Sequence, residues 1–182
     1  MHFSELGIFS IIISWIAFTC LLSKWKSDRT MSLSMHAADD RSAYFFFAAM
    51  LTLVTALFYI FMFKWFIPEF KLSSIFSVTL TLTYILQFVS AWVPDVKGIK
   101  RGIHRLFAYT FAFFLLLLSL QIIFFIKLTI VLQLVGGFSI VFMCLVWMLF
   151  LFVKKARRHY LFYQVGYIIC FQLFILAVTY LN

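Results

Sequence analysis

The sequence has few of the residues that keep a protein soluble in water. Only 12% of its 182 residues are charged, and only six residues are acidic. The chain has two prolines, whereas 65% of its residues are hydrophobic. A typical soluble domain has about 25% charged residues. A chain with half that share cannot cover its surface with polar groups, so we expect lipid to be its solvent. The composition therefore predicts an integral membrane protein.

Cysteine is also scarce, and its positions exclude two common kinds of small protein. Cys20, Cys144 and Cys170 all lie in apolar stretches, their number is odd, and none has the spacing of a metal ligand. Neither a disulfide framework nor a zinc ribbon follows from this pattern. We interpret the three residues as packing side chains. Histidines are missing from the middle of the apolar stretches, which argues against haem ligation, and we predict no cofactor.

Long apolar stretches are what the chain has in abundance. A transmembrane helix needs about 20 apolar residues, and an open-edged strand cannot satisfy its backbone in hydrocarbon. The sequence therefore predicts an all-α, six-helix transmembrane bundle that forms one domain over residues 1–182. The expected spans are 6–22, 43–63, 72–92, 104–126, 130–153 and 160–181.

The fifteen basic residues alternate between heavily and lightly charged breaks. The first, third and fifth breaks carry Lys24, Lys26, Arg29, Arg41, Lys97, Lys100, Arg101, Arg105, Lys154, Lys155, Arg157 and Arg158, whereas the second and fourth carry Lys64, Lys71 and Lys127. The positive-inside bias places the basic breaks in the cytoplasm and both termini outside. We expect the plasma membrane of a prokaryote.

The net charge of +9 fits anionic lipid headgroups at the helix ends better than nucleic acid. Membrane lipids are thus the expected partners, and the sequence leaves a homo-oligomer or a membrane-protein partner open.

Polar residues inside the spans mark faces that look inward. In the third span, Thr79, Thr83, Gln87 and Ser90 follow one another at spacings of about one helical turn. This stripe is typical of helix packing. It also fits a polar cavity between the third, fourth and sixth spans that opens to the cytoplasm. Other residues on a shared helix face are Ser10, Ser14 and Ala17 in the first span, His104, Ala108 and Ala112 in the fourth, and Gln164 and Gln172 in the sixth.

Three short motifs lie in the cytoplasmic breaks. Ser32-x-Ser34 follows the first span, Pro94-Asp95 follows the third, and Gly102-x-His104 opens the fourth. With these motifs the chain resembles, over its whole length, the prokaryotic membrane family called domain of unknown function nine-nine-eight. It is similar, more distantly, to the eukaryotic Frag/DRAM/Sfk membrane proteins.

The resemblance implies a fold of six helices, but it implies no activity. The likeness to Frag/DRAM/Sfk proteins implies lipid or anchor-related membrane biology. Two positions depart from the family pattern: Pro94-Asp95 stands where the family has Pro-x-Asp, and His36-Ala37-Ala38 replaces an acidic-apolar-Gly sequence.

A carboxylate, an imidazole and several cations at one membrane surface suit a lipid phosphate or a similar anion. We therefore predict that the cytoplasmic side binds a lipid headgroup or a small anionic ligand, and that Asp95 and His104 hydrogen-bond to each other directly or through one water. The candidate ligand-binding residues are Ser32, Ser34, His36, Gln87, Asp95, His104 and Arg105.

Three alternatives to this site stay open. Asp95 and His104 could only fix their loop, while the basic residues set the topology. A lipid-modifying hydrolase could use Ser32 or Ser34 as nucleophile, His104 as base and Asp95 to orient the base. His36, His104 and Asp95 could also hold a zinc ion, although no histidine pair has metal-ligand spacing on one helix.

Overall fold

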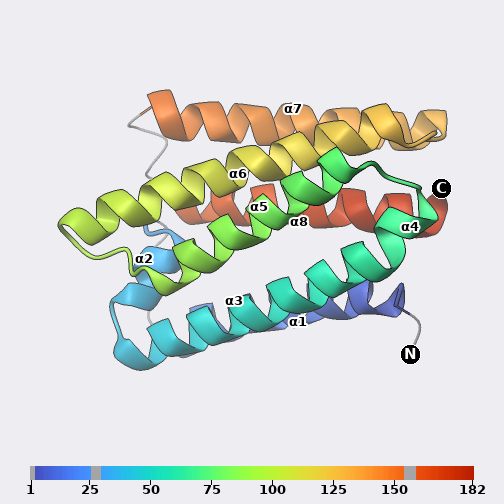
Figure 1. The fold of residues 1–182 in the computed structure, drawn as a ribbon. Coiled ribbons are helices and arrows are strands. Elements are labelled where there is room, and N and C mark those ends of the chain that lie inside the picture. Colours follow the sequence, from blue (N-terminus) through green and yellow to red (C-terminus); the bar gives the residue numbers. More distant parts are fainter. Residues whose placement is uncertain (1–2, 26–29, 154–158) are drawn as a thin grey trace.

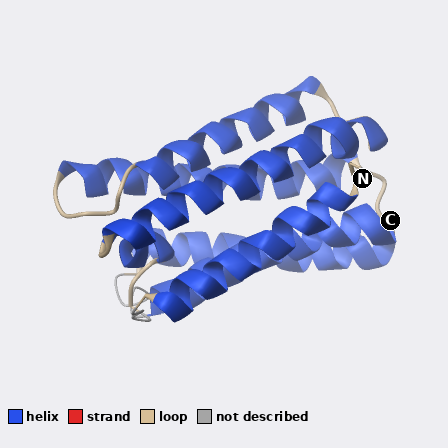
Figure 2. Cartoon of the chain, turned by 90° about the horizontal axis from the view of Figure 1, so that it is seen from below, coloured by secondary structure: helices blue, strands red, loops and turns tan. Residues whose placement is uncertain are grey.

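The computed structural model describes residues 3–25, 30–153 and 159–182, and these residues form helices and short connections with no strand (Figures 1 and 2). Six helical segments are long and apolar enough to cross a membrane. The predicted all-α, six-helix bundle is therefore confirmed. The spans are α1 (Glu5–Lys24), Arg41–Glu69, α5 (Ser74–Trp92), α6 (Ile99–Phe125), α7 (Ile130–Phe152) and α8 (Tyr160–Leu181).

Successive spans run up and down, so that alternate connections lie at opposite ends of the bundle. Both termini lie at one end and the short helix α2 (Leu33–Ala38) at the other (Figure 1). We call these the terminal end and the α2 end. The described basic residues at the α2 end are Lys24, Arg41, Lys97, Lys100, Arg101 and Arg105, and those at the terminal end are Lys64, Lys71 and Lys127. The alternation in the sequence thus separates charge between the two ends.

Two serine and aspartate caps shape the first connection. Ser32 precedes α2, and its Oγ accepts a hydrogen bond from the Met35 amide at 3.1 Å. Asp40 caps the next helix, α3 (Arg41–Phe61), where its Oδ1 accepts from the Ser42 and Ala43 amides at 2.8 and 2.9 Å. Such caps satisfy amides that have no partner within the helix. Helix α2 was not predicted from the sequence, because a helix of six residues has too few turns to show a periodic pattern.

The fourth span begins earlier than the sequence analysis predicted. Helix α6 starts at Ile99, after Gly98 with a φ of 100°, so His104 lies in the second helical turn and not at the start. Lys100 and Arg101 are helical although they are not apolar. A hydropathy boundary marks where the hydrocarbon begins, whereas the turn at Gly98 sets where this helix begins.

The second span is longer than predicted. Beyond Phe61 the chain continues through a π-helical turn, η1 (Met62–Phe66), and a short segment, α4 (Ile67–Glu69). Phe61, Met62 and Phe66 are fully buried here. A single π-helical turn inserted in a longer helix shifts the side chains that follow it. These three side chains belong to the main hydrophobic core.

Packing is closest toward the terminal end. The main core joins the last turns of the second span to Phe76 of α5, Ile122 of α6 and Phe174 of α8. Helix α7 approaches α8 at Gly136, where an added Cβ would lie 2.6 Å from Cε2 of Phe174. A smaller core at the α2 end consists of Leu21, Leu33, Ala37, Ala43 and Phe47. The space between these two cores is not completely filled, and it holds the candidate site.

A candidate ligand cavity inside the bundle

The interior contains two adjoining chambers. The α2-side chamber has a cavity volume of about 110 Å³ and the mid-span chamber one of about 90 Å³. Five residues line both chambers: Phe18, Leu51, Gln87, Phe111 and Ile168. A cavity thus lies between the third, fourth and sixth spans as predicted, but its lining is mostly apolar, and its opening to the cytoplasm stays a prediction. Its walls also include α1 and α3, which the polar stripe on α5 could not indicate.

His104 lies in the wall of the α2-side chamber and is only 6% exposed. Its Nδ1 is 2.7 Å from the carbonyl oxygen of Val93. Because a carbonyl oxygen only accepts hydrogen bonds, Nδ1 carries the proton when the ring is neutral. Nε2 is then left with a lone pair that accepts a hydrogen bond or a proton.

Five other polar groups that line the α2-side chamber come from four elements. Ser34 is on α2, Ser90 on α5, Tyr109 on α6, and Tyr160 and Gln164 on α8; all five line this chamber together with His104. The remaining lining is mostly aromatic and aliphatic. An apolar cavity with a few convergent polar groups is the usual form of a small-molecule site.

Helix α2 is fixed in place by α8 and by its own serines. Gln164 Oε1 accepts a hydrogen bond from the Leu33 amide at 2.9 Å. Ser32 Oγ and Ser34 Oγ are 2.9 Å apart. The two serines of the Ser-x-Ser motif therefore have different roles: Ser32 caps α2, and Ser34 lines the α2-side chamber.

Asp95 and His104 have separate partners, so the direct hydrogen bond predicted between them is wrong. Asp95 is 5% exposed, and its Oδ1 accepts from Arg101 Nε at 3.0 Å. Because α6 begins at Ile99, Arg101 is already helical and lies close to this carboxylate, while His104 turns to Val93. Both contacts fix the connection between α5 and α6. This agrees with the alternative in which Asp95 and His104 only fix their loop.

Four of the predicted ligand residues, Ser32, His36, Asp95 and Arg105, do not line the cavity. Asp95 is paired with Arg101. His36 is 3% exposed, and neither ring nitrogen has a hydrogen-bond partner among the described residues. The predicted residues that the cavity does bring together are Ser34, Gln87 and His104, with Ser32 bonded to Ser34.

The zinc alternative does not fit the arrangement of the described residues. Within residues 3–25, 30–153 and 159–182, no three His, Cys, Asp or Glu side chains lie close enough to hold a metal ion. His36, His104 and Asp95 are therefore not a metal site. Imidazole and carboxylate ligands must converge on one point to hold zinc.

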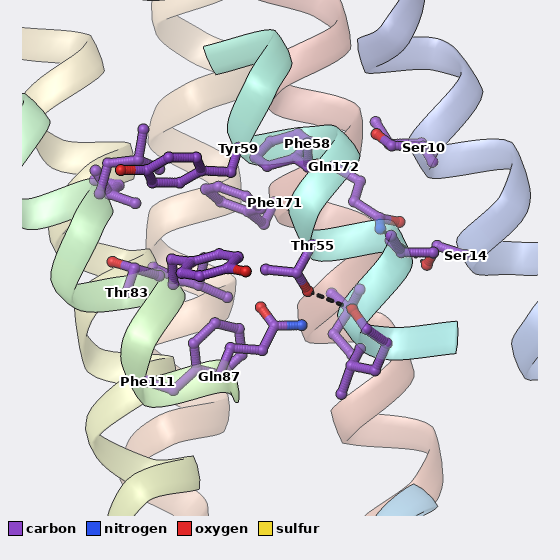
Figure 3. Close-up of a pocket in the computed structure, with 18 of the residues that line it drawn as sticks. Ser10, Ser14, Thr55, Phe58, Tyr59, Thr83, Gln87, Phe111, Phe171 and Gln172 are labelled. Atoms are coloured by element: carbon purple, nitrogen blue, oxygen red, sulfur yellow. Dashed lines mark hydrogen bonds between the residues drawn. The ribbon is translucent and has the colours of Figure 1, made fainter. Parts of the chain in front are cut away.

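The mid-span chamber is lined by hydroxyl, amide and aromatic groups (Figure 3). In Figure 3, Gln87 extends from α5 toward Thr55 on α3, next to Phe111 of α6. Gln87 and Thr83 of this chamber were predicted from the sequence, whereas Thr55 and Tyr84 were not. Tyr109 and Tyr160 of the α2-side chamber were not predicted either. A tyrosine inside a span was an available signal, because a buried phenol needs a hydrogen-bond partner.

Small residues on α6 leave room for the cavity. Ala108 and Ala112 line the α2-side chamber one and two turns after His104. The Tyr167 hydroxyl donates to the Ala112 carbonyl oxygen at 2.5 Å. On α1, Ser10 and Ser14 line the mid-span chamber in the same way. The small-residue tracks thus explain where the interior stays open.

The six spans of the described residues, with the cavity between them, define an integral membrane protein with a candidate internal site. Comparison of the chain with family models, curated proteins and solved structures gives no match. The family resemblance of the Ser32, Pro94-Asp95 and His104 motifs therefore stays a prediction, and function rests on the cavity alone.

Proposed function

We propose that this protein binds a membrane lipid, with an anionic headgroup in the α2-side chamber and part of one acyl chain directed toward the mid-span chamber. One observation carries the proposal. A cluster of polar groups around His104 faces an otherwise apolar cavity, at the end of the bundle that holds most of the described basic residues.

The polar groups of the chamber suit a phosphate or carboxylate. Tyr109, Tyr160 and Gln164 carry donors for anionic oxygens, and a protonated His104 adds an N–H at Nε2. Arg105 and the other basic side chains attract anionic headgroups to the same membrane surface. By the positive-inside bias this surface is the cytoplasmic one, with both termini outside, in the plasma membrane of a prokaryote.

The size of the cavity supports partial enclosure. The chambers measure about 110 and 90 Å³, less than the roughly 300–1,000 Å³ of pockets that surround a drug-sized ligand. A whole phospholipid does not fit. A headgroup and the first part of one chain do, while the rest of the lipid stays in the bilayer.

Lipid-dependent stabilisation tests this proposal. The purified protein in detergent should gain thermal stability from phosphatidylglycerol more than from phosphatidylcholine, because the former is anionic. His104→Ala and Tyr160→Phe should each reduce this difference. His159→Ala is the matched control, since His159 is at the same end but exposed. Equal stabilisation by both lipids, or an unchanged difference in His104→Ala, contradicts the proposal.

A lipid-modifying hydrolase is the second candidate, and the geometry of His104 favours it. Ser34 and His104 line one chamber, and the Val93 carbonyl orients the imidazole with Nε2 free to act as a base. Asp95 does not orient His104, because His104 Nδ1 is bonded to the Val93 carbonyl oxygen. Release of fatty acid from phosphatidylglycerol by the wild type but not by Ser34→Ala would establish this activity, and no release from the wild type would remove it.

A further inference from the structure

The mid-span chamber differs chemically from the α2-side chamber. No lysine, arginine, histidine, aspartate or glutamate is among its lining residues, which lie on α1, α3, α5, α6 and α8. A charged group is costly at this depth unless it is paired. The occupant of this chamber must therefore be uncharged.

Most polar groups around the chamber already have partners. The Thr55 hydroxyl donates to the Leu51 carbonyl at 2.6 Å, and the Thr83 hydroxyl to the Thr79 carbonyl at 2.7 Å. Gln172 uses both ends of its amide, accepting from Trp15 and donating to Ser14. These groups hold the helices together and have little capacity left for a ligand.

Gln87 and Tyr84 are different. Among the described residues, no hydrogen bond is made by the Gln87 side-chain amide or by the Tyr84 hydroxyl. Both line the chamber, and Gln87 lines the α2-side chamber as well. A polar group facing an apolar space gains more from a partner there than it would in water. The Gln87 amide and the Tyr84 hydroxyl are thus hydrogen-bond donors that lack an acceptor among the described residues.

The chamber also adjoins a narrow groove between α3 and α5 that has no room for a water molecule and is lined by Leu51, Thr52, Thr55, Tyr84, Gln87, Phe88 and Ala91. Four of these residues, Leu51, Thr55, Tyr84 and Gln87, line the chamber as well. Phe88 is 43% exposed at the outer face of α5, where the protein meets lipid. Only side chains therefore separate the chamber from the bilayer.

The two helices are joined on either side of this groove. Toward the α2 end, the Trp92 indole donates to Thr52 Oγ1 at 3.0 Å. Toward the terminal end, the Tyr59 and Thr81 hydroxyls are 3.2 Å apart. Between these contacts, side chains of α3 and α5 fill the space between Gln87 and the bilayer.

We propose that the mid-span chamber binds an uncharged, mainly apolar membrane molecule that carries a carbonyl oxygen, with that oxygen accepting hydrogen bonds from the Gln87 amide and the Tyr84 hydroxyl. The absence of lining charges selects a neutral ligand. The two donors select a hydrogen-bond acceptor. This inference uses neither His104 nor the basic residues, and its ligand competes for the mid-span chamber with the acyl chain of the headgroup proposal.

Two small probes that differ only in the acceptor test it. Para-decylacetophenone carries a carbonyl group, whereas para-decyl-ethylbenzene has the same size without one. We expect the ketone to bind the purified protein in detergent more tightly than the hydrocarbon, by about three- to tenfold for one hydrogen bond. Gln87→Leu should reduce this preference, and Gln87→Leu combined with Tyr84→Phe should remove it. Gln133→Leu is the matched control, because Gln133 is an exposed glutamine outside the cavity.

The carbonyl stretch of bound ketone gives a second reading. A hydrogen-bonded carbonyl absorbs at lower frequency than a free one, so the shift should be full in the wild type and Gln133→Leu, smaller in Gln87→Leu, and absent when Gln87→Leu is combined with Tyr84→Phe. Equal affinity for ketone and hydrocarbon, or an unshifted stretch in the wild type, would overturn the inference. Binding of neither probe would overturn it too and would leave the chamber to water. His104→Ala should bind the ketone like the wild type, which keeps this result separate from the headgroup proposal.

Discussion

The amide of Gln172 on α8 joins Trp15 of α1, whose indole Nε1 donates to Gln172 Oε1 at 2.7 Å. The same amide donates through Nε2 to Ser14 Oγ at 3.2 Å. These hydrogen bonds close the ring of helices where the last span meets the first. They lie beside the mid-span chamber, so that polar contacts here replace the side-chain packing found at the terminal end.

Gln172→Leu should therefore loosen the contact between α1 and α8. Hydrogen bonds between membrane helices stabilise by about 0.6 kcal/mol on average and up to about 2 kcal/mol. We expect a loss of roughly 1–2 kcal/mol, since two bonds disappear together. Reversible unfolding in mixed micelles measures the change. Gln133→Leu, which removes an exposed amide, should lower the free energy of unfolding by less. An equal loss in both variants would show that Gln172 does not stabilise the contact between α1 and α8.

Two neighbouring glycines on α7 should respond differently to alanine. A Cβ at Gly136 would lie 2.6 Å from Phe174 Cε2 and 2.8 Å from Ile123 Cδ1, whereas one at Gly137 has nothing within 4 Å. Overpacking of this kind costs about 1–3 kcal/mol, while Gly→Ala inside a helix gains about 0.5–1 kcal/mol. Gly136→Ala should thus lower the thermal midpoint and Gly137→Ala should raise it slightly. A drop of equal size in both would contradict the close approach of α7 to α8.

The separate partners of Asp95 and His104 predict additive effects on stability. Asp95→Asn weakens the contact to Arg101, and His104→Ala removes the contact to Val93. Each change should lower the free energy of unfolding by roughly 1–2 kcal/mol. The double variant should lose the sum within about 0.5 kcal/mol, as sites without shared partners do. A double variant no worse than either single one would show that the two side chains act as a pair after all.

The cap of α3 should make stability depend on acidity. Hydrogen bonds from the Ser42 hydroxyl and the Ala43 amide lower the pKa of the Asp40 carboxyl below its usual value of 3.8. Its contribution is therefore complete above that value and is lost as the pH falls through the lower pKa of the folded protein. Asp40→Asn keeps an acceptor at the cap but cannot titrate. Unfolding followed from pH 6 to pH 2 should show a smaller decline for Asp40→Asn than for the wild type, and identical curves would contradict this role.

The sequence predicted the parts of this fold that depend on hydrophobicity. Apolar stretches of sufficient length indicated six spans, and the stripe from Thr79 to Ser90 indicated an internal cavity. These features follow from the environment of each residue, which composition and helical period reveal directly.

Features that depend on distant partners were not predictable from the sequence. Helix α2 is held by Gln164, which lies 131 residues from Leu33. The partner of Asp95 depends on where α6 starts, and the turn at Gly98 decides that. Local spacing in the sequence contains none of this information. The predicted partner of Asp95 was therefore wrong, and His36 and Arg105 were predicted as ligand-binding residues although they do not line the cavity.

A cryo-electron microscopy structure in nanodiscs that contain phosphatidylglycerol tests the central claim most directly. Our account predicts elongated density inside the bundle, with its polar end in the α2-side chamber near Nε2 of His104 and its tail toward Gln87. His159→Ala should keep this density and His104→Ala should lose it. Lipid density confined to the outer surface, with the α2-side chamber filled by side chains or water alone, would contradict the account.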